Sequence, residues 1–437
     1  MPVSQLILLV GSNPVPNAVA ARCLADRNTQ IILVHSFDSS EVAERLRDWL
    51  AARLPDNAAQ LRRKPLNRPG DEYRPAAIQA ALRTNLPAPN PSSVVHLHYT
   101  GGTKAMTVHA YRTLETSLRQ EDVRFEASYL DPAALALIVD PTSTRQEDEV
   151  CPVPDDIRLT MADFLTLHGL KLDDPIGVST PMLPELAMAL VTDHATHGPA
   201  HWETWLNREL IPKTCRFKPS DLPGRLPDDP DGTLRDLMMP DTGRYLADGK
   251  LNAVQLRWPR GTEYENFNRV FDGLEVEQLP LREAATGMSV RSAKTLCKWL
   301  RGQWLESAVL HVLIEKKEQL GLHQCLMNIE LKGEFEFDVI AIKGYRLFAF
   351  SCTSGEQNKG YLKHKLFEAS IRARQMGGDE ARVALVCCSD KHQEVQSELE
   401  KEFDLKNKIR VFGRPDLANL EGALAHWIES QSPKRNV

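Results

Sequence analysis

The chain has 437 residues, a net charge of −6, 42% hydrophobic residues and 26% charged residues. That length predicts two or three domains, and that composition is typical of a folded protein rather than a disordered one. No run of about 18 apolar residues occurs, so we expect no membrane span. The eight cysteines are scattered without a CxxC pair, which argues against a zinc ribbon and indicates reduced thiols in the cytoplasm.

Apolar and amphipathic segments alternate over the first 140 residues. The apolar runs predict strands at Gln5–Val10, Gln30–His35, Val94–His98, Arg124–Tyr129 and Ala134–Val139. Helical spacing predicts helices at Asn17–Ala25, Ser40–Arg53 and from Ala105 to about Leu118. This order is typical of a doubly wound, mostly parallel α/β sheet, which binds ligands beyond the carboxyl ends of its strands.

The segment from 151 to 290 is expected to link or couple two domains. Helices are predicted at Leu159–Leu170 and Pro184–Val191, and the Pro-, Asp- and Gly-rich stretch Lys218–Gly249 predicts a loop or insertion. His194, His197 and His201 have metal-like spacing, but Pro199 intervenes and no cysteine accompanies them, so we do not expect zinc there.

The last segment, 291–437, predicts a second α/β unit. Helices are expected at Ser292–Leu300, Trp304–Leu320, Tyr361–Met376 and Leu417–Glu429. Strands are expected at Gln324–Leu331, Phe335–Ile342, Arg346–Cys352, Arg382–Cys388 and Ile409–Phe412. The order of helix, three strands, helix and strand forms a compact unit.

Two of the first domain's strands end in glycine turns that precede helices. Gly11, Ser12 and Asn13 follow the first strand, and residues 100–104 (TGGTK) follow the third. Such turns expose backbone N–H groups beside a helix N-terminus, where anionic ligands are favoured. Neither turn matches a Walker A loop or GxGxxG, and an ordinary pair of glycine turns is the alternative.

These stretches, LILLVGSNPVPN and VVHLHYTGGTKAMTVHAY, resemble the CARF domain over residues 1–150. The resemblance implies a homodimer that binds a cyclic oligoadenylate made by type III CRISPR complexes, with cyclic tetra-adenylate favoured. By the resemblance, the ligand-binding residues are Gly11, Ser12, Asn13, Ser36, Thr100, Gly101, Gly102, Thr103, Lys104 and Met106.

Carboxylates in the last segment point to metal-dependent phosphodiester cleavage. Glu306 lies on a predicted helix, and Asp338 interrupts an otherwise apolar strand, where an unpaired carboxylate is costly. This arrangement resembles the PD-(D/E)xK nuclease fold, with Mg²⁺ or Mn²⁺ held by Glu306 and Asp338. The family's E-x-K positions are Ser351 and Thr353 here. Either the role of the missing lysine has passed to the next helix, to Lys365 with Lys363 as substitute, or the nuclease is inactive.

Together, the two resemblances imply a cyclic-oligoadenylate-activated endonuclease that cleaves DNA, RNA or both, with an allosteric link between sensor and nuclease. The alternative is an inactive effector that binds the messenger and uses its C-terminal lobe to hold nucleic acid or protein. Slow cleavage of the messenger by the sensor itself is also open. Gly-x-Ser-x-Gly and His-Glu-x-x-His are absent, which argues against common hydrolases and metalloproteases.

Overall fold

The computed structural model describes residues 3–66, 68–85, 93–121, 123–142, 145–170, 176–215, 245–259, 278–331, 335–355, 358–403, 405 and 407–431. Most of the stretch predicted as a Pro- and Asp-rich insertion, 218–249, lies outside these residues.

The N-terminal domain is built on one seven-stranded sheet in the order β3-β2-β1-β4-β5-β6-β7. Its strands are β1 (Gln5–Val10), β2 (Gln30–His35), β3 (Arg62–Pro65), β4 (Val94–His98), β5 (Arg124–Asp131), β6 (Ala136–Val139) and β7 (Glu149–Pro152). The first five strands run parallel, while β6 and β7 are antiparallel. Its helices are α1 (Val15–Leu24), α2 (Ser40–Arg53), α3 (Pro75–Asn85) and α4 (Lys104–Gln120). Every residue of β1 is buried, as expected for a strand with helices on both faces of its sheet.

The C-terminal domain contains a five-stranded sheet in the order β10-β11-β12-β13-β14. Its strands are β10 (Gln324–Leu331), β11 (Phe335–Lys343), β12 (Arg346–Thr353), β13 (Arg382–Cys387) and β14 (Ile409–Phe412). The first three strands form an antiparallel meander, and β12, β13 and β14 are parallel. Its helices are α14 (Trp304–Glu315), α15 (Lys317–Leu320), α16 (Lys359–Gly377), α17 (His392–Phe403), α18 (Arg414–Leu417) and α19 (Leu420–Ser430).

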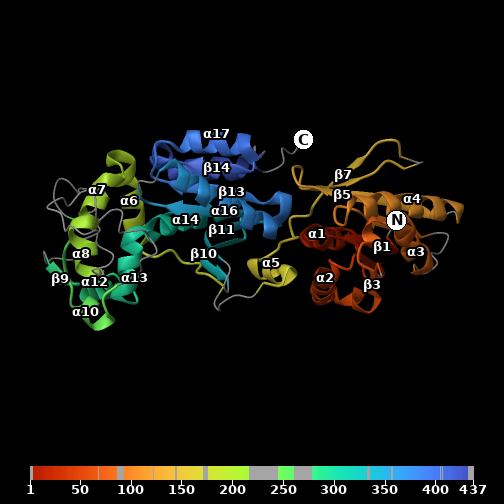
Figure 1. Cartoon of the computed structure of the whole chain (residues 1–437), viewed down its shortest axis with the longest axis horizontal. Helices are drawn as coiled ribbons and strands as arrows, with labels where there is room; N and C mark the ends of the chain where they lie inside the picture. The colour runs from red at the N-terminus through yellow and green to blue at the C-terminus, as the bar shows by residue number, and fades with distance from the viewer. Residues whose placement is uncertain are drawn as a thin grey trace.

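The helical segment lies at the far end of the C-terminal domain from the N-terminal sheet (Figure 1). It comprises α6 (Pro184–His197), α7 (Pro199–Trp205), α8 (Ile211–Thr214), α10 (Asp248–Asn252), α12 (Leu281–Gly287), α13 (Ala293–Lys298) and the short pair β8 (Gln255–Arg257) and β9 (Gln278–Pro280). These helices share a hydrophobic core with α14 and with one face of the second sheet. Most of the expected coupling segment therefore packs behind the second sheet and not between the two domains.

One hydrophobic core joins the two sheet domains. It runs from Leu46 on α2, through Phe164 on α5 (Met161–His168), to Leu366 on α16 and Leu347 on β12. Buried Arg346 adds a polar connection, because its guanidinium donates to the backbone oxygens of Pro132 and Gln431. The two domains are thus packed against each other through α5 and α16. Among the described residues, no helix is both long and apolar enough to cross a bilayer.

Asp163 is a buried carboxylate that fixes α5 against the N-terminal domain. It forms a capping box with Thr160 at the start of α5, and it accepts hydrogen bonds from the Trp49 indole at 2.9 Å and from Arg53. We predict that Asp163→Ala lowers the free energy of unfolding by about 3 kcal/mol, because the cap and two donors lose their acceptor. Chemical denaturation measures this loss. Replacement of the exposed Asp56 by alanine is the control, and equal losses in both variants would contradict the assignment.

Candidate functional site

The first site lies where two parallel strands of the N-terminal sheet end side by side. β1 lies between β2 and β4 in the sheet. The chain passes from β1 to β2 and β3 on one side of β1, and then returns to form β4 on its other side. This is the topological switch point of the sheet, the position at which such sheets bind ligands. The turns after β1 and β4 border a cavity of about 350 Å³. Its lining consists of Gly11, Ser12, Asn13, Pro16, Thr100, Gly101, Gly102, Leu130, Pro132, Arg374, Gly378, Asp379 and Glu380.

The glycines are required because the two turns pack backbone against backbone. A Cβ at Gly11 would lie 2.8 Å from the backbone nitrogen of Gly102, and a Cβ at Gly101 would collide with the carbonyl oxygen of Leu9. Gly102 also has a φ of +78°, a conformation that other residues rarely adopt. The buried amide of Asn17 donates to Leu9 O at 2.9 Å and holds the first turn against its strand.

Six of the ten predicted ligand residues line this cavity: Gly11, Ser12, Asn13, Thr100, Gly101 and Gly102. The other four do not. Met106 is buried in the core beneath Gly102, and Thr103 caps α4 by accepting from Met106 N. Ser36 is buried and shares a hydrogen bond of 3.0 Å with Ser39, while Lys104 is exposed at the start of α4. Met106 therefore packs in the core and Ser36 stabilises a turn, and the ligand role that the resemblance implies for them stays a prediction.

The C-terminal domain forms the opposite wall of the cavity. α16 ends beside the glycine turns, and a Cβ at Gly378 would collide with the Asn13 side-chain amide. Arg374 and Asp379 form an ion pair of 2.9 Å on this wall. Glu380 is 3% exposed, and burial raises its pKa to about 7. These residues were not predicted from the sequence, because nothing local indicates that a turn in the C-terminal domain closes a cavity of the N-terminal domain.

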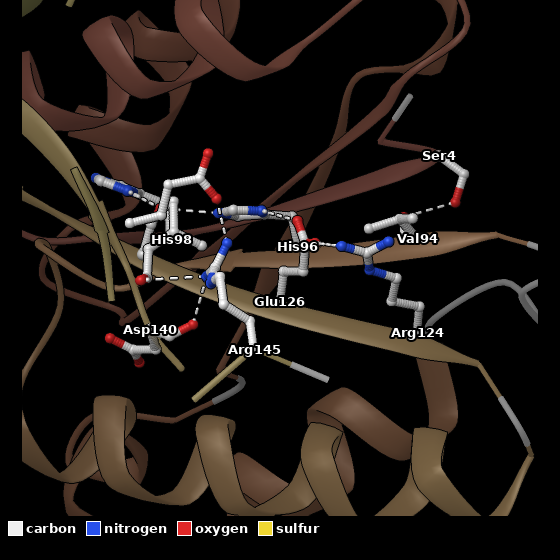
Figure 2. A network of polar contacts seen from close by, with 11 residues as sticks. Ser4, Val94, His96, His98, Arg124, Glu126, Asp140 and Arg145 are labelled. Carbon is white, nitrogen blue, oxygen red and sulfur yellow. Dashed lines mark hydrogen bonds and ion pairs between the residues drawn. The ribbon is translucent and has the colours of Figure 1, made fainter. Parts of the chain in front are cut away.

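On β4, which ends at the cavity, His96 and His98 are both buried and both lie within hydrogen-bond distance of Ser128 (Figure 2). His96 Nε2 lies 2.8 Å and His98 Nδ1 3.2 Å from Ser128 Oγ, and Glu126 lies 3.5 Å from His96 Nδ1. Burial lowers the pKa of His98 to about 3, while hydrogen bonding to His96 lowers the pKa of Glu126 to about 2. The neutral ring of His98, hydrogen-bonded to Ser128, thus supports β4, the strand that ends at the cavity.

The second site gathers the acidic residues of the C-terminal domain. Glu306 lies in the first turn of α14, and Asp338 lies on β11. Asp338 Oδ2 accepts hydrogen bonds from Cys352 N at 2.7 Å and from Ser351 Oγ at 3.1 Å, so β12 fixes this carboxylate. Ser351, at the first predicted E-x-K position, thus acts as a donor to the acidic residue.

Burial raises the pKa values of both carboxyl groups. Burial is the larger cause for Glu306, followed by the charges of Asp338 and Glu336. Burial also raises the pKa of Asp338, although Cys352 and Lys365 oppose the shift. Glu336 belongs to the same electrostatic cluster. Glu336 was not among the site residues predicted from the sequence, and Glu334, two residues before it, lies outside the described residues.

The two candidate lysines of α16 have different partners. Lys365 is partly buried, which alone lowers its pKa, but the negative charges of Asp338, Glu368 and Glu336 produce a net increase. Lys363 instead pairs with Glu398 and Glu402 of α17, the latter at 3.7 Å. The structure therefore brings Lys365 to the acidic cluster and directs Lys363 to a neighbouring helix.

The acidic cluster fits a hard divalent cation. Glu306 Oε2 is buried, and among the described residues it has no hydrogen-bond partner. An unpaired carboxylate oxygen beside a second carboxylate is unfavourable without a cation, and oxygen ligands are those that Mg²⁺ and Mn²⁺ prefer. Glu306 and Asp338 are therefore suited to hold such an ion.

The raised carboxyl pKa values predict how stability depends on pH. In metal-free protein the folded state keeps protons at pH values where the unfolded chain has lost them, so the free energy of unfolding falls as the pH rises from 5 to 8. Glu306→Gln should flatten this dependence and raise Tm by a few degrees at pH 8. Thermal unfolding in the presence of a chelator measures both. Glu315→Gln, at an exposed position of the same helix, should change neither; a profile for Glu306→Gln identical to that of the native chain would contradict the prediction.

Two solved structures align with nearly the whole chain. Protein VC1899 from Vibrio cholerae aligns with a TM-score of 0.62 at 15% identity, covering 98% of this chain and 99% of its own. Can2 from Sulfobacillus thermosulfidooxidans, solved in complex with cyclic tetra-adenylate, aligns with a TM-score of 0.61 at 17% identity, covering 97% and 99%. No protein-family model and no curated protein matches the sequence. The predicted α/β fold class is confirmed: a Rossmann-like domain with a mostly parallel sheet, a helical segment and a second α/β domain form one chain with the fold of Can2.

Proposed function

We propose that this chain is a nuclease of type III CRISPR antiviral defence that requires a divalent metal and is activated by a cyclic oligoadenylate. The observation that carries the proposal is α16, a single helix with Lys365 at the acidic cluster and Arg374 at the wall of the glycine-lined cavity. The complex of Can2 with cyclic tetra-adenylate supports the same ligand for this chain.

The messenger site would use the backbone amides of the two glycine turns and the guanidinium of Arg374. Amides beside a helix N-terminus bind phosphate oxygens, and glycine allows the ligand to approach the backbone closely. A cyclic tetra-adenylate is symmetric and larger than one cavity of about 350 Å³. We therefore infer a homodimer in which each chain contributes one such mouth to one ring.

Cleavage would take place at the acidic cluster. Glu306 and Asp338 would hold Mg²⁺ or Mn²⁺, which supplies Lewis-acid polarisation of the scissile phosphate. Lys365 would stabilise the negative charge that develops on the phosphoryl oxygens, because the charges of Asp338 and Glu336 already act on its ammonium group and raise its pKa. Ser351 and Cys352 N would keep Asp338 oriented through their hydrogen bonds to its Oδ2.

Coupling between the two sites would run along α16. Lys365 and Arg374 are nine residues apart, which is about 14 Å along a helix axis. A messenger that pulls on Arg374, or displaces the turn at Gly378, would move the helix as a rigid body and shift Lys365 relative to Asp338. The same displacement would also reorient the two nuclease domains of the dimer about the dimer axis.

The first test separates cleavage from sensing. We predict that Asp338→Ala lowers metal-dependent cleavage of plasmid DNA and single-stranded RNA by at least about 100-fold, because the cation loses a ligand. Binding of cyclic tetra-adenylate, measured by calorimetry, should remain unchanged. Lys365→Ala should lower kcat with less effect on KM, whereas the exposed Lys401→Ala should have no effect.

Two results would contradict this assignment. Loss of activity in Lys363→Ala with full activity in Lys365→Ala would show that Lys363, and not Lys365, supplies the catalytic ammonium group. Messenger binding with no cleavage of either substrate by the native chain, in Mg²⁺ or in Mn²⁺, would favour the inactive effector over the nuclease.

The buried Glu380 predicts a pH-dependent messenger affinity. Its pKa of about 7 means that the carboxyl group is largely neutral at pH 6 and charged at pH 8, where it repels phosphates. We expect the Kd for cyclic tetra-adenylate to rise by up to about tenfold between pH 6 and pH 8. Glu380→Gln should keep the pH 6 affinity at pH 8, and Glu315→Gln should behave like the native chain. A pH profile that survives in Glu380→Gln would show that another group is responsible.

A further inference from the structure

Three metal-ligating side chains meet in the helical segment, away from both sites described above. Asp193 lies on α6, His197 ends α6, and His201 lies on α7. Asp193 Oδ1 is 3.0 Å from Nδ1 of His197 and 3.1 Å from Nδ1 of His201. All three ligand atoms lie within 4.8 Å of one another. One carboxylate oxygen and two imidazole nitrogens thus face a common point.

This cluster differs from the one that histidine spacing suggests. His194 Nδ1 is engaged by Leu190 O at 2.8 Å, and its buried ring packs against Trp304 at a centroid distance of 4.6 Å. His194 is therefore part of the core, and its neighbour Asp193 takes the place of the third ligand. A carboxylate can serve as the third ligand of zinc, so a zinc site at this position does not require a cysteine.

Pro199 does not separate the histidines, contrary to the expectation from the sequence. The chain leaves α6 at Gly198, which has a φ of +77°, and Pro199 begins α7. The rings of His197 and His201 remain neighbours, with centroids 5.2 Å apart. The break at Gly198 thus brings the end of α6 and the start of α7 together, so that both histidines lie beside the same carboxylate.

The carboxylate of Asp193 is buried, so its negative charge is poorly solvated. The Asp193 side chain is 1% exposed, and its second oxygen, Oδ2, is buried with no hydrogen-bond partner within the described ranges. Burying a carboxylate is costly unless it is paired or coordinates a metal. The His197 and His201 side chains are 49% and 22% exposed, so an ion bound between them would be reached from solvent.

We propose that Asp193, His197 and His201 form a site for a transition-metal cation of the zinc class, with water in the fourth position. Tetrahedral zinc with bonds of 2.0–2.1 Å places its ligand atoms roughly 3.3 Å apart, close to the two separations from Asp193 Oδ1. Two imidazole ligands select zinc, cobalt or nickel over Mg²⁺ and Ca²⁺. The ion would clamp α6 to α7 across Gly198.

The test is a Zn²⁺ titration of the full-length chain carrying Glu306→Gln and Asp338→Asn, so that the acidic cluster does not compete. After removal of metals with a chelator, calorimetry at pH 7.5 should show one equivalent of zinc per chain. His197→Ala and His201→Ala should each weaken this binding by at least about 100-fold. Co²⁺ should give the visible absorption of a four-coordinate ion.

The matched control is His426→Ala, which removes an exposed histidine from α19 and should leave the titration unchanged. His197 is half-exposed, so its replacement should preserve the far-ultraviolet circular dichroism spectrum. The absence of a zinc equivalent, or an equivalent that persists in both His197→Ala and His201→Ala, would overturn the proposal. The three side chains would then form a hydrogen-bonded group only.

Discussion

The close packing of Gly378 against Asn13 is the contact that closes the cavity between the two domains. Only a residue without a side chain allows the end of α16 to approach the first glycine turn so closely. The φ of +66° at Gly378 adds a second reason for glycine. Arg346 and the core through α5 hold the same two domains together, so the glycine-lined cavity and α16 form one packed unit.

The acidic cluster, in contrast, is electrostatically unfavourable in the folded protein. Two half-buried carboxyl groups with raised pKa values lie close together, and Lys365 compensates part of their charge. Such an arrangement costs free energy in metal-free protein and is typical of functional sites. The hydrogen bonds from β12 to Asp338 hold its orientation in place before any ion binds.

Most strands of both sheets could be predicted from the sequence because they are largely apolar runs that end at a glycine or polar turn. β1 from Gln5 to Val10 agrees with its predicted bounds, as does α2 from Ser40 to Arg53. The short strands β3 and β7 were missed, since Arg62–Pro65 and Glu149–Pro152 carry charged or proline residues and lie at or near the sheet edges.

Residues that act through tertiary contacts were harder to predict. The glycine turns were found because they are local, whereas Arg374 and Glu380 reach the mouth only through domain packing. Met106 follows the turn in sequence, but the helix period directs it into the core. Asp193 was overlooked because the histidine spacing drew attention to His194, which the fold buries against Trp304.

The most direct test of the account is the initial rate of cleavage as a function of cyclic tetra-adenylate concentration, at a fixed concentration of chain and Mn²⁺. Our account requires no cleavage without the messenger and a linear rise under tight-binding conditions that ends at one ring per two chains. A rate that is already maximal without messenger, or that stays at zero when the ring is demonstrably bound, would contradict it.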